Sequence, residues 1–214
     1  MKHLKVPYLP ALDVLDLSSV NFLLESKGQR DYINQANWDT FPYKPIAVFD
    51  IARSDTALYL HYFVRGFSLK AEQTQDGSSV YLDSCVEFFM KKPGKNYYMN
   101  FEFNCIGTCD ASRRLSRVEK FPLKEEEYAL IRRHSSLPKM HIPTEDTGLH
   151  AWELSVSIPF GLMELDPLRM PEKIWANFYK CADGTSKPHY LSWSPVGTPQ
   201  PDFHRPEFFG EIYF

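Results

Sequence analysis

The chain has 214 residues, 43% of them hydrophobic, which is enough to bury a full core and excludes a disordered protein. Its 24 basic and 27 acidic side chains give a net charge of −3, so the positive potential needed for nucleic-acid binding is missing. The mean hydropathy of −0.37 and the lack of a long apolar run exclude a membrane span. No repeat divides the sequence, and we expect residues 1–214 to form a single domain.

Short segments rich in apolar and aromatic residues, separated by turn residues, predict a series of β-strands. In chain order they are Ile46–Ala52, Ala57–Val64, Ser84–Met90, Tyr97–Asn104, Trp152–Ile158, Ile174–Lys180, Tyr190–Trp193 and Gly210–Phe214. The alternation is clearest in Ala57–Val64 and Trp152–Ile158, where every second side chain is apolar and points to one side.

Helices are expected to be rare, because 16 prolines stand against 10 glycines and proline is poorly tolerated inside a helix. The one segment that reads as a helix of any length is Lys124–Arg133, and its second half reads equally well as a strand. The sequence therefore predicts an all-β fold, an antiparallel β-sandwich of two sheets with few or no helices.

The predicted hairpin Ser84–Asn104 carries polar side chains on one face. Asn100, Glu102 and Asn104 alternate with apolar residues, and a turn that pairs Met90 with Tyr97 places Glu87 opposite Asn100 and diagonal to Glu102. Amides beside carboxylates offer donors and acceptors to a polyhydroxylated ligand. The same face reads equally well as a solvated surface without a ligand.

The C-terminal fifth places Trp193, Phe203, His204 and Arg205 in and around a proline-rich loop. Aromatic rings on a stiff loop lose little entropy on binding and can stack on a sugar ring. The alternative interpretation is that these rings close one end of the sandwich as ordinary core.

The four cysteines, Cys85, Cys105, Cys109 and Cys181, follow no zinc-binding spacing, and we prefer reduced, partly buried thiols to disulfides. A metal held by Cys181, His189 and His204 is conceivable but follows no known ligand pattern, and structural histidines are the preferred interpretation. Asp183 and Asp202 lie in expected loops and are considered as calcium ligands, although no EF-hand run accompanies them.

With these motifs in view, the chain resembles the family 9 carbohydrate-binding modules, a β-sandwich group known as appendages of xylanases. The resemblance follows YLDSCVEFFM (Tyr81–Met90), NFEFNCIGT (Asn100–Thr108), WELSVSIPF (Trp152–Phe160), LSWSP (Leu191–Pro195) and FHRPEFFG (Phe203–Gly210) in order over nearly the whole length. It is closest to the single-domain, family-9-like branch.

The resemblance implies a ligand site in which two aromatic rings sandwich a terminal sugar. By motif the rings fall at Tyr81 and Phe203, with Trp193 as a further candidate, and the polar contacts fall at Glu87, Glu102 and Asn104. The xylanase modules carry tryptophans at the ring positions and an arginine where Glu102 stands. The family also implies calcium as a structural ion, without matched ligands in this sequence.

We expect a non-catalytic module that binds a mono-, oligo- or polysaccharide, supports polysaccharide catabolism and partners a glycoside hydrolase. Two other hypotheses stay open. One is a haem-binding sandwich with His61 and Met99 as axial ligands, and the other is a glycosyl hydrolase that uses Glu87 and Glu102. Met1–Pro10 has no apolar segment of signal-peptide length, and the localisation stays open: secreted or periplasmic if a signal has been removed, otherwise cytoplasmic.

Overall fold

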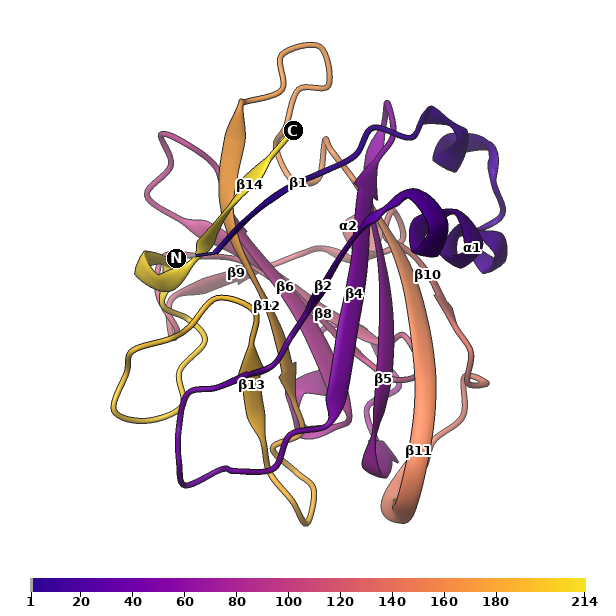
Figure 1. The fold of residues 1–214 in the computed structure, drawn as a ribbon, viewed down its shortest axis with the longest axis vertical. Helices are drawn as coiled ribbons and strands as arrows, with labels where there is room; N and C mark the ends of the chain where they lie inside the picture. The colour runs from indigo at the N-terminus through magenta and orange to yellow at the C-terminus, as the bar shows by residue number, and fades with distance from the viewer. Residues whose placement is uncertain (1) are drawn as a thin grey trace.

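Two β-sheets face each other across an apolar core in the computed structural model, which describes residues 2–214 (Figure 1). Met1, the first residue of the segment considered as a signal peptide, lies outside the described residues. The nine-stranded sheet runs in the order β1-β14-β12-β6-β7-β8-β9, with β13 paired to β12 and β3 paired to β13. The five-stranded sheet runs in the order β10-β11-β5-β4-β2.

The strands of the nine-stranded sheet are β1 (His3–Lys5), β3 (Gln35–Ala36), β6 (Cys85–Lys91), β7 (Tyr98–Asn104), β8 (Cys109–Arg114), β9 (Lys120–Pro122), β12 (Lys173–Cys181), β13 (Tyr190–Ser192) and β14 (Gly210–Tyr213). Those of the five-stranded sheet are β2 (Gln29–Tyr32), β4 (Ile46–Arg53), β5 (Ala57–Ala71), β10 (Arg132–Ser135) and β11 (Ile142–Pro159). The strand pairs are antiparallel except β1 and β14, which run parallel. The predicted β-sandwich is confirmed.

The core between the sheets is built from the side chains that the alternation assigned to one face. Leu58, Leu60 and Tyr62 of β5 are fully buried there. Leu154 and Val156 of β11 join them from the neighbouring strand. Burial of these side chains at about 1.5–3 kcal/mol each is the main force that holds the two sheets together.

The register of β6 and β7 differs from the expected one. Met90 pairs with Met99, so Glu87 lies directly opposite Glu102 and not opposite Asn100. The turn is longer than assumed, and the shift amounts to two residues. Because side chains alternate with period two, an even shift leaves both carboxylates on the same face.

The longest helix, α1 (Leu17–Lys27), was not predicted from the sequence. It covers the outer face of the five-stranded sheet, where Val20 and Leu24, one helical turn apart, pack with Tyr59 (Figure 1).

The expected helix is α2 (Glu125–Tyr128), a single turn, and the second half of that segment forms β10. Three 3-10 turns complete the fold: η1 (Pro10–Val14), η2 (Val80–Leu82) and η3 (Pro206–Phe208). No helix in residues 2–214 is long and apolar enough to cross a membrane.

The outer face of the nine-stranded sheet is also covered, so the polar row on β7 is not a solvated surface. The segment that leads into β14 (residues 196–209), called the C-terminal loop below, lies over this face. Its Phe203 and Phe209 form a second apolar cluster with Phe89, Tyr98 and Tyr179 from the strands. All seven residues of β7 are consequently buried. Beside this cluster the covering segments leave a hollow, which is the candidate site.

Candidate functional site

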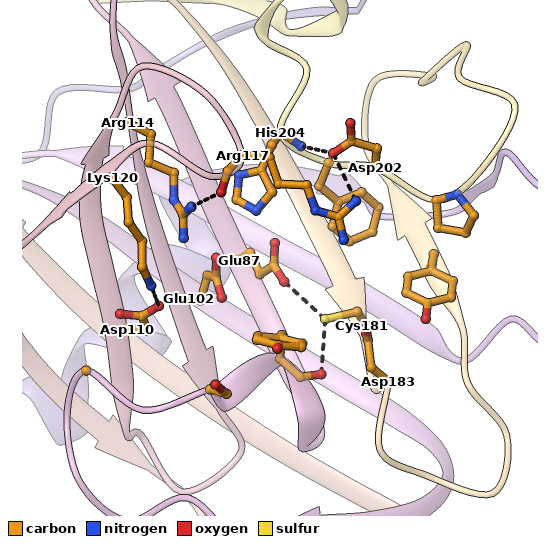
Figure 2. Close-up of a pocket in the computed structure, with 16 residues that line it drawn as sticks. Glu87, Glu102, Asp110, Arg114, Arg117, Lys120, Cys181, Asp183, Asp202 and His204 are labelled. Atoms are coloured by element: carbon orange, nitrogen blue, oxygen red, sulfur yellow. Dashed lines mark hydrogen bonds and ion pairs between the residues drawn. The ribbon is translucent and has the colours of Figure 1, made fainter.

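A cavity of about 340 Å³ opens on the outer face of the nine-stranded sheet (Figure 2). This volume is at the lower end of the ~300–1,000 Å³ range of small-molecule sites. Strands β6, β7, β8 and β12, the 3-10 turn η2 and the C-terminal loop all contribute to its wall. The lining residues are Gly77, Ser79, Tyr81, Glu87, Glu102, Asp110, Arg114, Arg117, Lys120, Cys181, Asp183, Tyr190, Pro201, Asp202, Phe203 and His204.

The floor is a row of three carboxyl groups across three neighbouring strands. Glu87 on β6 pairs with Glu102 on β7, which pairs with Asp110 on β8, and each is at most 4% exposed. Burial raises the pKa of Glu87 to about 8, and burial together with the charges of Glu87 and Asp110 raises the pKa of Glu102 well above its usual range. The Glu87–Glu102 pair therefore retains a proton at neutral pH and can both donate and accept hydrogen bonds.

Basic side chains on β8 and β9 stand beside this floor, and none of them was singled out from the sequence. Arg114, which is 5% exposed, donates from Nε to Asn100 Oδ1 at 2.6 Å and from Nη1 to the Arg117 carbonyl at 2.8 Å. Lys120 lies 3.8 Å from Asp110. In Figure 2 Arg114 and Lys120 lie on one side of Glu102, and Cys181 and Asp183 lie on the other side of Glu87. Burial raises the pKa of Asp183 to about 6.

Tyr81 is the most accessible ring in the lining, with 40% of its surface exposed. It lies on η2, which is fixed to the turn after β12 because the Asp183 N–H donates to the Tyr81 carbonyl at 3.1 Å. The Gly184 N–H likewise donates to the Leu82 carbonyl at 3.0 Å. A Cβ at Gly184 would lie 2.6 Å from that carbonyl oxygen, so the close contact requires glycine.

Phe203 and His204 reach the same cavity from the C-terminal loop. One face of the Phe203 ring is stacked on Tyr179 at 4.1 Å, and only 9% of the residue is exposed. His204 Nδ1 lies 3.0 Å from the Tyr98 hydroxyl, and its backbone N–H donates to Asp202. Burial, followed by the charges of Arg114, Arg117 and Lys120, lowers the pKa of His204 to about 3, so the ring is neutral.

The two predicted asparagines stand behind the cavity and position its lining. Asn100 donates to Glu102 Oε1 at 2.9 Å and accepts from Arg114. It therefore connects the carboxyl group of Glu102 to the guanidinium of Arg114. Asn104 donates to Asp83 and to the Gln73 carbonyl, and its Oδ1 accepts from the Thr108 N–H. Asn104 therefore anchors the segment that leads into η2 and Tyr81.

Besides the two asparagines, two more of the predicted contact residues do not line the cavity. Trp193 is fully buried between the sheets, where it packs edge-on against Phe49 and Phe178 and donates from Nε1 to Asp31. It belongs to the core and is removed from the ring candidates. Arg205 pairs with Glu207, two residues further along the chain, and does not line the hollow.

The residues that the metal and haem hypotheses require lie apart in the structure. His189 contacts Lys180 Nζ and the Lys187 carbonyl, and it does not cluster with Cys181 and His204 in the described chain. His61 lies under α1, 3.5 Å from Glu25, whereas Met99 lies in the core between the sheets. These two cannot be axial ligands of one haem.

The cysteines and the acidic loops were the remaining candidates for ion binding. All four cysteines are free and buried, as preferred from the sequence. Calcium prefers six to eight oxygen ligands, but within residues 2–214 no three carboxylates converge closely enough to hold an ion. Asp183 and Asp202 both line the cavity, where Asp202 lies 3.7 Å from Arg117.

The fold and the cavity define a β-sandwich binding module whose site lies on the outer face of one sheet. Residues 18–214 match the model of carbohydrate-binding family 9, and the chain belongs to this family. The solved structure of a provisionally named carbohydrate-binding protein from Bacteroides uniformis ATCC 8492 is 33% identical, with a TM-score of 0.92, over 100% of this chain and 99% of that one.

More distant structures share the fold. The family 9 module from Caldicellulosiruptor kristjanssonii in complex with glucose is 13% identical with a TM-score of 0.61, over 99% of this chain and 95% of that one. Its complex with cellotriose gives 13% identity and a TM-score of 0.58, over 99% and 93%. A comparison with curated proteins finds no match.

Proposed function

We propose that residues 1–214 form a single non-catalytic carbohydrate-binding module that holds the terminal ring of a glucose-containing saccharide in the cavity. The observation that carries this proposal is the lining itself, which combines a row of carboxyl groups, a guanidinium and an accessible aromatic ring within one hollow. Family membership and the sugar complexes of the C. kristjanssonii module support the ligand class.

Sugar hydroxyls both donate and accept, so a binding site needs both kinds of partner. Burial raises the pKa values of Glu102 and Glu87, so their carboxyl groups offer both acceptor oxygens and protonated O–H donors at the floor. Two nitrogens of Arg114 hydrogen-bond within the protein, and among the described residues Nη2 has no partner, which leaves it for a hydroxyl. Arg114 thereby offers, from β8, a charged donor beside the carboxyl groups of the floor.

Tyr81 supplies the apolar contact. A pyranose presents axial C–H groups on its faces, and a ring that is 40% exposed at the rim can cover one of them. Phe203 also lines the cavity, and the ring face that is not stacked on Tyr179 is the one that can contact the sugar. The two rings are smaller than the tryptophan platforms expected from the resemblance, so we expect a Kd of ~10⁻⁶–10⁻³ M.

Hydrolysis by Glu87 and Glu102 is the less favoured function of the same site. A glycosidase needs one ionised carboxylate next to one acid, whereas burial raises the pKa of both groups here. A wild-type protein that leaves aryl glycosides intact, while still binding sugar, would agree with a binding module. Turnover abolished by Glu102→Gln would support the enzyme.

We place the module in polysaccharide catabolism, where it holds a partner glycoside hydrolase at its substrate. Depletion of the protein by insoluble cellulose or xylan, reversed by free cellotriose, tests this role. Protein that stays in the supernatant with both polymers would contradict it.

The binding itself is tested by calorimetric titration with glucose, cellotriose and methyl glucoside. Saturable heat with glucose and cellotriose is expected, and methyl glucoside reports whether the free reducing end is required. The absence of saturable binding across the three sugars, in protein whose melting shows it to be folded, would overturn the proposal.

A further inference from the structure

Strand pairing brings together two cysteines that lie 96 residues apart in the chain. Cys85 on β6 is the direct partner of Cys181 on β12 in the antiparallel register. Glu87 lies two residues after Cys85, so period-two alternation places it on the same face of the sheet. All three side chains are at most 2% exposed.

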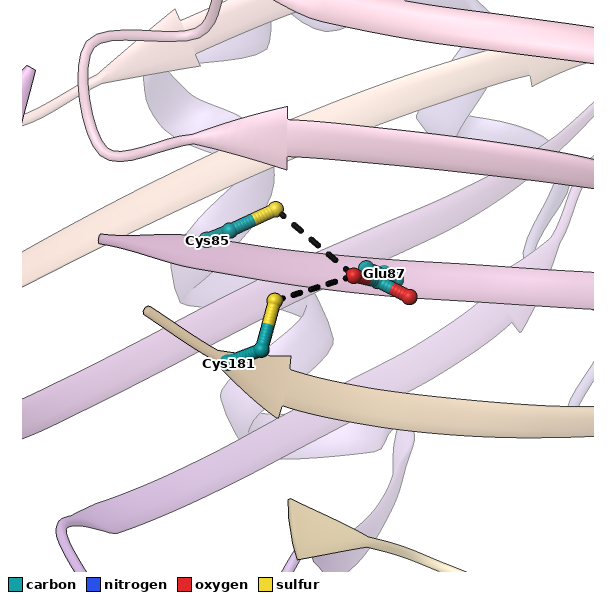
Figure 3. A group of neighbouring side chains, drawn as sticks. All are labelled: Cys85, Glu87 and Cys181. Atoms are coloured by element: carbon teal, nitrogen blue, oxygen red, sulfur yellow. Dashed lines mark hydrogen bonds between the residues drawn. The ribbon is translucent and has the colours of Figure 1, made fainter. Parts of the chain in front are cut away.

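Both thiols converge on one carboxylate oxygen, as Figure 3 shows. The Cys181 Sγ lies 3.0 Å from Glu87 Oε1, and the Cys85 Sγ lies 4.0 Å from the same atom. The three potential ligand atoms lie within 4.8 Å of one another, and no other group of this kind occurs among the described residues.

These distances fit tetrahedral coordination. Zinc bonds to thiolate sulfur at ~2.3 Å and to carboxylate oxygen at ~2.1 Å, which separates the sulfur and oxygen atoms by ~3.6 Å and the two sulfur atoms by ~3.8 Å. The observed sulfur–oxygen distances of 3.0 and 4.0 Å lie on either side of the first value. The two sulfur atoms lie at most 4.8 Å apart, so they would have to approach each other by no more than ~1 Å to reach the tetrahedral separation.

We propose that Cys85, Glu87 and Cys181 form a binding site for a thiophilic divalent cation of the zinc class at the floor of the cavity. Two thiolates and a carboxylate are a ligand set that selects such ions over calcium or magnesium. The site goes beyond sugar binding and does not depend on it.

The cavity gives an ion access to this site, and nearby basic side chains balance part of its charge. Cys181 and Glu87 line the cavity, so an ion can enter there, and a water molecule from the cavity would complete its coordination. A divalent ion with two thiolates and one carboxylate has a net charge of −1. Lys180 and Arg114 act electrostatically on Glu87 and partly compensate this charge. Binding releases the two thiol protons to solvent.

The test is a titration of the reduced, metal-free protein with Co²⁺, whose thiolate charge-transfer absorption reports sulfur coordination. We expect saturation at one Co²⁺ per chain and loss of the band when Zn²⁺ is added. Cys85→Ala should weaken Co²⁺ binding more than ~100-fold, beyond the ~10–100-fold cost of losing an outer partner. Cys109→Ala is the matched control, because Cys109 is equally buried but packs in the core between the sheets.

A wild-type protein without the charge-transfer band overturns the site, and so does a Cys85→Ala variant that retains it. If Cys85→Ala does not fold, the protons that the wild type releases on binding Co²⁺ provide a second measurement. The wild type should release about two thiol protons per Co²⁺, in addition to any carboxyl proton. Release near zero would show that the thiols are not ligands. Sugar binding can fail without affecting either result.

Discussion

Tyr81 gives the sharpest test of the sugar site, because its ring can be removed without opening the core. The ring is 40% exposed at the rim, and η2 is fixed through the backbone carbonyls of residues 81 and 82. Tyr81→Ala should therefore leave the fold intact. A stacked ring contributes about 0.5–1.5 kcal/mol. At about 1.4 kcal/mol for each factor of ten, cellotriose binding should weaken about 2- to 12-fold.

Two variants control this measurement by calorimetry. Tyr81→Phe keeps the ring and should stay within about twofold of the wild type. Tyr32→Ala removes a comparably exposed tyrosine, 51% exposed, from β2 of the other sheet and should not change affinity. If Tyr81→Ala binds cellotriose as Tyr32→Ala does, the ring is not part of the site and the stacking argument is refuted.

Three further predictions concern the surroundings of the cavity. Arg114→Gln removes a charged donor and should weaken cellotriose binding about 10- to 100-fold, since hydrogen bonds to charged groups contribute about 1.5–3 kcal/mol. Asn104→Ala removes three buried hydrogen bonds and should lower the free energy of unfolding by about 2–4 kcal/mol in urea denaturation. The pKa of His204 is lowered to about 3, so its contribution to stability is complete above pH 6.5 and is lost toward pH 3; His204→Gln should lose less stability than the wild type over that range.

Matched substitutions separate these effects from general damage. Arg113→Gln alters the neighbouring arginine on β8, which pairs with Glu127 and Glu164 away from the cavity, and affinity should not change. Asn96→Ala, in the exposed turn before β7, should change stability by less than about 0.5 kcal/mol. A His204→Gln protein with the same pH dependence of unfolding as the wild type would contradict the assigned neutral ring.

Strands such as β5 and β11 were predictable because alternation is local. Leu58 and Leu60 face the core since a half-buried strand repeats every two residues, and this holds whatever its neighbours are. The same parity placed Glu87 and Glu102 on one face although the assumed register was two residues off. Helix α1 could not be recognised in this way, because Phe22 lies on its exposed side and obscures the helical period.

The composition of the site was less predictable, because it depends on strand order. In CDASRR (Cys109–Arg114) only Cys109 and Ala111 alternate with polar residues, which is too short a pattern to stand out, so β8 was not recognised and Arg114 was missed. Trp193 looked like a platform because its sequence neighbourhood is rich in proline and aromatic residues, but its core position follows from the packing of β4 and β12 around it. Likewise, the proximity of Cys85 and Cys181 follows only from the pairing of β6 with β12.

A crystal structure of the protein soaked with glucose tests the central claim most directly. A single pyranose should lie in the hollow over β6, β7 and β8, with hydroxyls on Glu102 and Arg114 and one face on Tyr81. A sugar bound at another surface, with this hollow filled only by solvent, would contradict the account.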